Sequence, residues 1–190
     1  SAMVEQGMAE GVIEKYNPAI VSSAIFSIIQ WFPVWLNRSY AAHPEPVIEA
    51  VLDVLVNGLA SQPHQFADID FPELNNLSLD NFDREMQNRI KREAFYRVGS
   101  IYFNQKGYKG TSLDEIAASL DVTKGAFYYH IKNKEELLYE CFNRTLDVEK
   151  MLLAKAGSTE GSGLEKLELA LRYLFNVQFS EDGPLIRYRL

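Results

Sequence analysis

The sequence predicts an all-α protein, and three observations carry this prediction. The chain of 190 residues has 47% hydrophobic and 24% charged residues, a balance that supports a folded core. Apolar residues recur at helical spacing in several long segments. No segment alternates between apolar and polar residues for long enough to indicate a strand.

Two apolar segments near the N-terminus are predicted to form helices, one over residues 18–36 and one over residues 45–60. The first contains no charged residue, a pattern that raises the question of a membrane span. Several serines, Gln30 and Pro33 interrupt it, so we expect a helix buried in a core or in a subunit interface. Pro44 and Pro46 suit the first turn of the second helix.

Residues 61–80 are predicted to form a long loop, because they contain Pro63, Pro72 and the pair Asn75-Asn76. A connection of about twenty residues is long for the inside of a compact domain, so this loop marks a domain boundary. Beyond it, amphipathic patterns predict long helices over residues 82–104 and 134–154, and one more helix from Leu164 onward.

Between these long helices, two short helices are predicted to be joined by a tight turn. Ser112 offers an N-cap to the first, and Ser112 with Glu115 has the spacing of a capping box. Residues 121–123 form the turn, and Thr123 caps the second short helix, residues 124–130. A helix this short is not stable alone, so Phe127 and Ile131 must dock on the preceding helix. The arrangement is a helix-turn-helix.

The second short helix has the dimensions and the chemistry to enter the major groove of DNA. Gly125 and Ala126 keep its leading end narrow enough to approach base edges. Lys134 begins the next helix, where its ammonium and the free backbone N–H groups favour a phosphate. The outward side chains of the short helix supply one cation and several hydrogen-bonding groups: Lys124, Tyr128, Tyr129 and His130.

Residues 111–138 resemble the DNA-binding module of the TetR family of bacterial regulators. One departure is Asp121, where the family often has Gly in the turn, but Asp tolerates a left-handed backbone better than most residues do. The resemblance is carried by Ile116-Ala117, Val122-Thr123-Lys124-Gly125, Phe127-Tyr128, His130-Ile131 and Asn133-Lys134-Glu135-Glu136-Leu137.

The resemblance implies a site and a function. It implies a repressor that binds double-stranded operator DNA as a homodimer, with a small-molecule effector controlling that binding. Phosphate contacts are implied for Thr111, Thr123, Tyr128, His130 and Lys134. Base or groove contacts are implied for Lys124, Gly125, Ala126 and Tyr129. A dimerisation or scaffold module that no longer reads DNA is the alternative.

The net charge of −7 would ordinarily argue against nucleic acid as a partner. Residues 1–80, however, carry two basic residues against ten acidic ones, whereas residues 81–150 carry twelve against eleven. The acidity therefore belongs to the N-terminal segment. The predicted DNA-binding region keeps a group of cations: Lys106, Lys109, Lys124, Lys132 and Lys134.

The order of the segments is unusual for the family that the chain resembles. There the DNA-binding helices come first and the dimer-forming pair comes last, the reverse of the order expected here. We expect a fragment of a longer tandem protein, with a circularly permuted single unit as the rival. The expected parts are dimerisation helices over 1–62, a linker over 63–80, the helix-turn-helix domain over 81–150 and the start of an effector domain over 151–190.

Four aromatic residues could line a pocket for an effector, although packing in a core or dimer interface is the favoured interpretation: Trp31, Trp35, Tyr173 and Phe179. His43 and His64 have no second ligand at metal spacing and are expected at the surface. Cys141 is expected to be a small core residue.

The remaining composition argues for a regulator rather than an enzyme. A single cysteine excludes a disulfide framework within the chain and a multi-cysteine metal site, and it fits a reducing, cytoplasmic setting. The sequence contains no nucleophile–base pair, phosphate loop or metal cluster at recognisable spacing. We therefore expect no catalytic residue, no metal and no cofactor.

Overall fold

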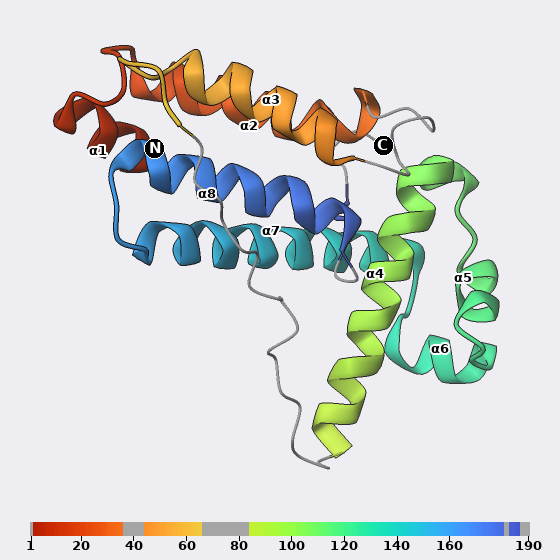
Figure 1. The fold of residues 1–190 in the computed structure, drawn as a ribbon. Coiled ribbons are helices and arrows are strands. Elements are labelled where there is room, and N and C mark those ends of the chain that lie inside the picture. Colours follow the sequence, from red (N-terminus) through yellow and green to blue (C-terminus); the bar gives the residue numbers. More distant parts are fainter. Residues whose placement is uncertain (1, 36–43, 66–83, 181–182, 187–190) are drawn as a thin grey trace. The chain divides into compact units, whose positions relative to one another are not determined.

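The computed structural model describes residues 2–35, 44–65, 84–180 and 183–186 (Figure 1). Over these ranges the secondary structure is helical and includes no strand, so the predicted all-α class is confirmed. The elements are α1 (Ala2–Glu10), α2 (Pro18–Trp35), α3 (Glu45–Asn57), α4 (Arg84–Gly110), α5 (Leu113–Ser119), α6 (Lys124–His130), α7 (Lys134–Ser158), α8 (Gly163–Asn176) and the 3-10 turn η1 (Val177–Phe179).

The chain forms two compact units, and each is assembled from segments that are separate in the sequence. Unit 1 consists of Ser1–Phe66 with Leu146–Gly183, and unit 2 of Ala67–Thr145 with Pro184–Leu190. Unit 1 therefore joins the N-terminal helices to α8. The sequence-based division into four consecutive parts stays a prediction.

Helix α8 is the central element of unit 1, because α1, α2 and α3 all pack on it. A capping box formed by Ser162 and Glu165 begins the helix. Its first residue lies so close to α1 that a Cβ atom on Gly163 would stand 2.1 Å from the backbone nitrogen of Gly7. Only glycine permits this approach, so the N-terminal helix and α8 depend on Gly163 for their contact.

A buried network of charged groups fastens α8 to the N-terminal segment. Glu168 is 1% exposed and accepts a hydrogen bond from Arg172 Nε at 2.9 Å. The same guanidinium donates to Glu49 of α3, with Nη2 3.1 Å from Oε2. His64 Nε2 lies 2.8 Å from the other Glu168 oxygen. Residues on both sides of unit 2 in the sequence thus share one ionic network.

Unit 2 is built around a core between α4, α5, α6 and the first half of α7. Arg144 of α7 also pairs with Glu93 of α4 at 2.7 Å. The chain contributes Ile186 after α8, and its backbone N–H donates to Thr145 Oγ1 at 3.1 Å. The large side chains of this core are Phe95, Phe103, Ile116, Phe127, Ile131 and Leu137.

Most predicted helices form close to their expected bounds, and α6 has the bounds that the sequence predicts. Helix α3 ends at Asn57, because residues 59–61 turn to hydrogen-bond with residues 12–14. Helix α4 extends to Gly110, beyond the predicted end at residue 104, but Gly107 interrupts its helical geometry with φ of 68°. Helix α1 has no counterpart in the prediction.

Two expectations are wrong. Ser112 makes no side-chain cap hydrogen bond, because Glu115 pairs with Lys106 at 2.7 Å instead of closing the capping box. His64 is not a surface residue, since its side chain is 14% exposed and pairs with Glu168. His43 lies outside the described residues. Across the described ranges, no helix is both long enough and apolar enough to cross a bilayer.

Removing Arg172 should destabilise unit 1. In Arg172→Leu the buried Glu168 loses its main cationic partner, which should lower the free energy of unfolding by about 3 kcal/mol. The double variant Glu168→Leu/Arg172→Leu should lose less, because no buried charge is left behind. Urea unfolding followed by tryptophan fluorescence tests this, since both tryptophans of the chain lie on α2 of unit 1. A double variant that is less stable than the single one would refute the role of charge.

Candidate nucleic-acid interface

Helix α6 is held in place by its inward side chains, as the sequence predicts. Phe127 is fully buried, with its ring centroid 4.9 Å from that of Phe95 on α4. Ile131 is also buried at the end of the helix. At the start, Thr123 Oγ1 accepts a hydrogen bond from Ala126 N at 3.2 Å. Asp121 in the turn has φ of 53°, the left-handed conformation expected at this position.

The outward face of α6 is exposed along its whole length. Lys124, Gly125 and Ala126 are exposed at its first turn. Tyr129 follows with 80% of its surface exposed, and Tyr128 with 43%. All five lie on one seven-residue helix, so the structure brings these predicted contact residues together on the exposed surface of a single short element.

His130 lies at the edge of this face, half-buried against two rings. Its centroid is 5.7 Å from Phe95 and 5.0 Å from Tyr129. Burial lowers the pKa of His130, and the charges of Arg92 and Lys91 lower it further. The imidazole is therefore mainly neutral at pH 7 and acts as a hydrogen-bonding group rather than as a cation.

Lys134 is held at the N-terminus of α7. Its ammonium donates to the Thr111 carbonyl at 3.0 Å and lies 4.6 Å from the ring centroid of Tyr108. Thr111 itself is 3% exposed, and its hydroxyl donates to the Gly107 carbonyl at 2.8 Å. The side chain of Thr111 is thus turned away from the exposed face that the α6 residues share.

Asp114 is the residue at this surface whose role sequence reasoning missed. Its carboxylate accepts a hydrogen bond from Lys124 Nζ at 2.6 Å, and the hydroxyl of Tyr128 lies 3.5 Å from its other oxygen. The hydrogen bond and the charge of Asp114 raise the pKa of Lys124. Asp114 contacts α6 because of the way that α5 and α6 pack on each other. The sequence alone does not show that two residues ten positions apart will meet in this way.

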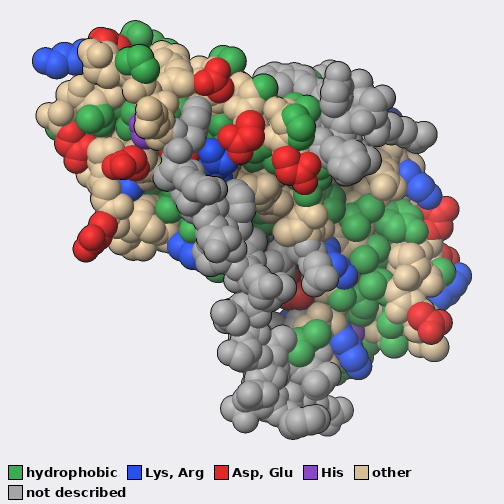
Figure 2. Space-filling view, in the orientation of Figure 1, with side chains coloured by type: hydrophobic (Ala, Val, Ile, Leu, Met, Phe, Trp, Pro, Cys, Tyr) green, Lys and Arg blue, Asp and Glu red, His purple; other side chains and the backbone are tan. Residues whose placement is uncertain are grey.

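Charges of both signs cover the helix-turn-helix. Lys106 pairs with Glu115 at 2.7 Å and lies 5.0 Å from the ring centroid of Tyr102. In Figure 2, basic and acidic side chains are interspersed over α4–α6 instead of forming a patch of one sign. The nearly equal numbers of acidic and basic residues in this part of the sequence are therefore also mixed on its surface, where cations lie next to carboxylates.

The aromatic candidates for an effector site are not gathered in one place. Tyr173 is buried, with the Lys155 ammonium 5.3 Å from its ring centroid. Phe179 packs edge-on against Phe32, and Trp31 is 40% exposed on α2. The side chain of Trp35 lies outside the described part of the structure. Their role in ligand binding stays a prediction.

Cys141 is a core residue, as expected. It is fully buried in unit 2, and its thiol donates to the Tyr96 carbonyl at 3.2 Å. Burial raises the pKa of the Cys141 thiol to about 12. The reactive thiolate is therefore essentially unpopulated at neutral pH.

Comparisons with known proteins agree with this geometry. Residues 91–141 match the family model of bacterial regulatory proteins, tetR family, and so cover α5, α6 and the adjoining parts of α4 and α7. The Transposon Tn10 TetC protein of Escherichia coli is 35% identical over 117 residues, which are 57% of this chain and 59% of that protein. No solved structure matches the chain.

Two further relatives match shorter stretches of the chain. The biofilm operon icaADBC HTH-type negative transcriptional regulator IcaR of Staphylococcus epidermidis is 45% identical over 49 residues, 24% of this chain and 26% of IcaR. An HTH-type transcriptional regulator of Staphylococcus aureus is 28% identical over 95 residues, half of each protein. The chain spans less than two thirds of the length of these relatives.

The fold, the exposed α6 residues and the comparisons identify residues 91–141 as a helix-turn-helix domain. This domain matches the family model of bacterial regulatory proteins, tetR family.

Phe127→Ala should detach α6 from unit 2. Loss of a buried phenyl ring should lower the free energy of unfolding by about 3–5 kcal/mol, because a cavity opens beneath a helix that is unstable alone. Amide hydrogen exchange of residues 124–130 measures the effect directly. Tyr129→Ala is the matched control on the same helix, since this ring is exposed and its removal should change stability by less than about 0.5 kcal/mol. Unchanged protection of α6 in Phe127→Ala would contradict the anchoring role.

Proposed function

We propose that this protein represses transcription by binding operator DNA as a homodimer, without catalysing a reaction, in the bacterial cytoplasm. The observation that carries the proposal is the set of exposed residues on α6, a helix that is anchored by the buried side chain of Phe127. The helix-turn-helix relatives named above support it. A helix of this width fits the major groove, where base edges carry a distinct pattern of donors and acceptors.

The contacts divide into those that read bases and those that hold phosphates. The exposed tips of Lys124 and Tyr129 reach base edges, while Gly125 and Ala126 allow the backbone to approach closely. Lys134 offers its ammonium to a phosphate beside the first turn of α7. Four further side chains contact phosphates at the rims of the groove: Thr111, Thr123, Tyr128 and His130. For Thr111 this contact requires that its hydroxyl first leave the Gly107 carbonyl.

DNA binding requires an exchange of partners at Asp114. In the absence of DNA, the Lys124 ammonium is paired with the Asp114 carboxylate. When Lys124 contacts a base, its ammonium either leaves Asp114 or contacts the carboxylate and the base together. The carboxylate also repels a phosphate that is placed wrongly beside α5. A DNA site that does not offset the lost ion pair with new hydrogen bonds is therefore bound weakly. Asp114 in this way increases discrimination between DNA sequences more than it increases affinity.

Variants of base-reading and phosphate-holding residues should behave differently. With an operator selected by the wild-type protein from random duplexes, Lys124→Ala and Tyr129→Ala should each weaken binding by about 1–3 kcal/mol and relax the preferred sequence. Lys134→Ala should weaken binding to all duplexes alike and lower the salt slope by about 1. Fluorescence anisotropy at several salt concentrations measures both effects. Unchanged affinity and preference in Lys124→Ala and Tyr129→Ala would reject α6 as the reading element.

A face of α2 and α3 supports the dimer. Ile20 is 68% exposed and Val54 is 72% exposed, and both border a shallow groove of about 360 Å³ between the two helices. Tyr16 adds a further exposed apolar surface at its edge. Exposed apolar residues gathered in this way are typical of protein–protein interfaces. A two-fold dimer supplies two α6 helices, and the operator that we propose therefore has two half-sites about 34–36 Å apart.

A charge on this face should separate the subunits. Ile20→Glu should raise the dimer dissociation constant by at least about 10-fold, because it places a carboxylate in an apolar contact. Sedimentation velocity over a concentration series measures the change. Lys15→Glu, an exposed position outside the groove, is the control and should leave the constant nearly unchanged. A wild-type protein that stays monomeric at every concentration would eliminate this interface.

Small-molecule control is the second part of the proposal. A ligand that binds unit 1 more tightly in one conformation shifts the population toward that conformation, and linkage then changes the affinity for operator. Helix α7 supports such coupling, because it is continuous from Lys134 to Ser158 and contributes residues to both units.

A scaffold that has lost DNA reading is the second candidate function. The balanced charge around α6 favours it, since Lys124 and Lys106 are both neutralised by carboxylates. The same anisotropy titration decides between the two, because a scaffold shows no salt-dependent affinity for any duplex.

A further inference from the structure

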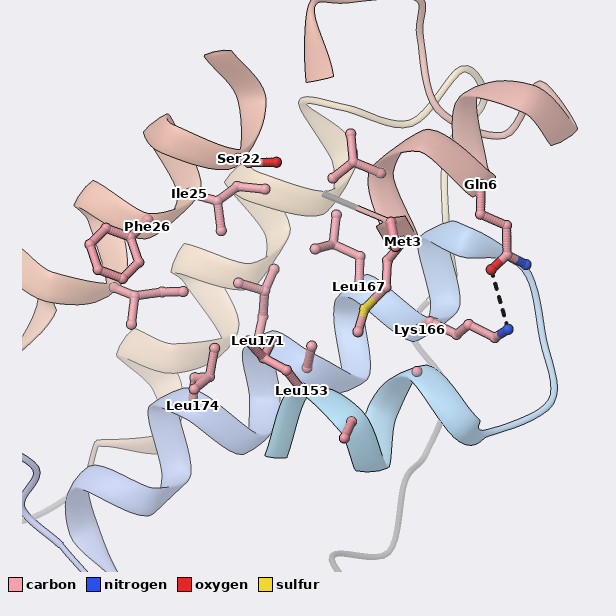
Figure 3. Close-up of a pocket in the computed structure, with 16 residues that line it drawn as sticks. Met3, Gln6, Ser22, Ile25, Phe26, Leu153, Lys166, Leu167, Leu171 and Leu174 are labelled. Atoms are coloured by element: carbon pink, nitrogen blue, oxygen red, sulfur yellow. Dashed lines mark hydrogen bonds between the residues drawn. The ribbon is translucent and has the colours of Figure 1, made fainter. Parts of the chain in front are cut away.

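Unit 1 contains an apolar pocket of about 570 Å³ between helices α1, α2, α7 and α8 (Figure 3). Its volume lies within the range of about 300–1,000 Å³ that is usual for small-molecule sites. Ile25 of α2 and three leucines of α8 supply the apolar wall: Leu167, Leu171 and Leu174. Trp31, Tyr173 and Phe179, which the sequence analysis named as candidates for an effector site, are not among its described lining residues.

A single polar atom in this wall lacks a partner. The hydroxyl oxygen of Ser22 is buried and forms no hydrogen bond among the described residues. Figure 3 shows Ser22 on α2 beside Ile25, at the wall of the pocket. A buried hydroxyl without a partner destabilises the protein, and such groups in native proteins normally have a ligand or water to bind.

The polar end of the pocket carries balanced charge. Lys166 Nζ donates to Gln6 Oε1 at 3.2 Å (Figure 3). Gln6 Nε2 donates in turn to Glu10 at 2.7 Å. Glu10 also accepts a hydrogen bond from the backbone of Gly163 at 2.7 Å. The hydrogen bond from Gln6 and that from Gly163 keep the pKa of Glu10 low, so its negative charge offsets the ammonium of Lys166. Among the described residues that line the pocket, the ammonium of Lys166 is therefore opposed by the nearby carboxylate of Glu10.

The pocket is accessible without opening the fold. Phe26 on α2 is 50% exposed, and Leu153 on α7 is 41% exposed. Both line the pocket, and a molecule that enters between them covers apolar surface now in contact with water. Apolar area and one hydrogen bond are therefore the two sources of affinity that this site offers.

We propose that this pocket binds an uncharged, mainly aliphatic molecule whose single hydroxyl or carbonyl group hydrogen-bonds to Ser22 Oγ. The inference rests on the proposed small-molecule control and names the class of molecule that exerts it. A carboxylate of the same length binds less well, because it loses hydration and meets no uncompensated cation.

Displacement of the uncharged fluorescent probe N-phenyl-1-naphthylamine tests the proposal. Decan-1-ol should displace the probe from the full chain at a concentration at least about tenfold lower than decanoate does. Ser22→Ala should weaken decan-1-ol binding about fivefold, the loss expected for one hydrogen bond. Ser23→Ala, which alters an exposed serine on the same helix, should leave binding unchanged. Ala154→Phe, which adds a ring at an exposed position of the pocket wall, should abolish probe binding.

Three results would overturn the proposal: no probe binding, decanoate binding as tight as decan-1-ol, or no effect of Ser22→Ala. Operator binding is measured separately by anisotropy without ligand, and Ser23→Ala should retain it. If the pocket fails while operator binding persists, only the ligand assignment is wrong. If the wild-type protein binds no duplex, the proposed function fails whatever the pocket binds.

Discussion

The position of every outward side chain on α6 depends on the burial of Phe127. A helix of seven residues lacks the length to be stable in water, so its structure comes from packing on α4 and α5. Phe127 contacts Phe95, and Thr123 fixes the first turn, which together set the direction of the helix. The side chains that we assign to base reading take no part in this anchoring. Sequence preference can therefore change by substitution at Lys124 or Tyr129 without loss of the fold.

The charge around α6 makes recognition conditional. Most cations of a DNA-binding surface gain free energy simply by releasing counterions from phosphates. Here Lys124 must first break its ion pair with Asp114. The half-buried His130 has a lowered pKa, so it adds no second positive charge at neutral pH. For the DNA binding that we propose, this arrangement predicts weak non-specific attraction and a stronger dependence on correctly placed hydrogen bonds.

Sequence reasoning succeeded where the determinants are local. The bounds of α6, the Thr123 cap and the left-handed Asp121 all follow from residues within a few positions of one another. It failed where a distant partner decides the outcome. His64 pairs with a glutamate 104 residues away, and Glu115 is drawn from Ser112 to Lys106. The need for glycine at position 163 was not predicted either, because the residues beside it carry no sign of the close approach of α1.

The discontinuity of unit 1 has a consequence for the order of folding. Its ionic network joins residues 104 and 123 positions apart, whereas Lys124 and Asp114 of unit 2 are separated by only ten. Closing a long loop costs more entropy, and domains rich in distant contacts fold more slowly. During synthesis the apolar helix α2 leaves the ribosome well before α8, on which it packs. The chain thus exposes its most hydrophobic helix while unit 2 folds, and this interval is when it is most prone to aggregate or to engage a chaperone.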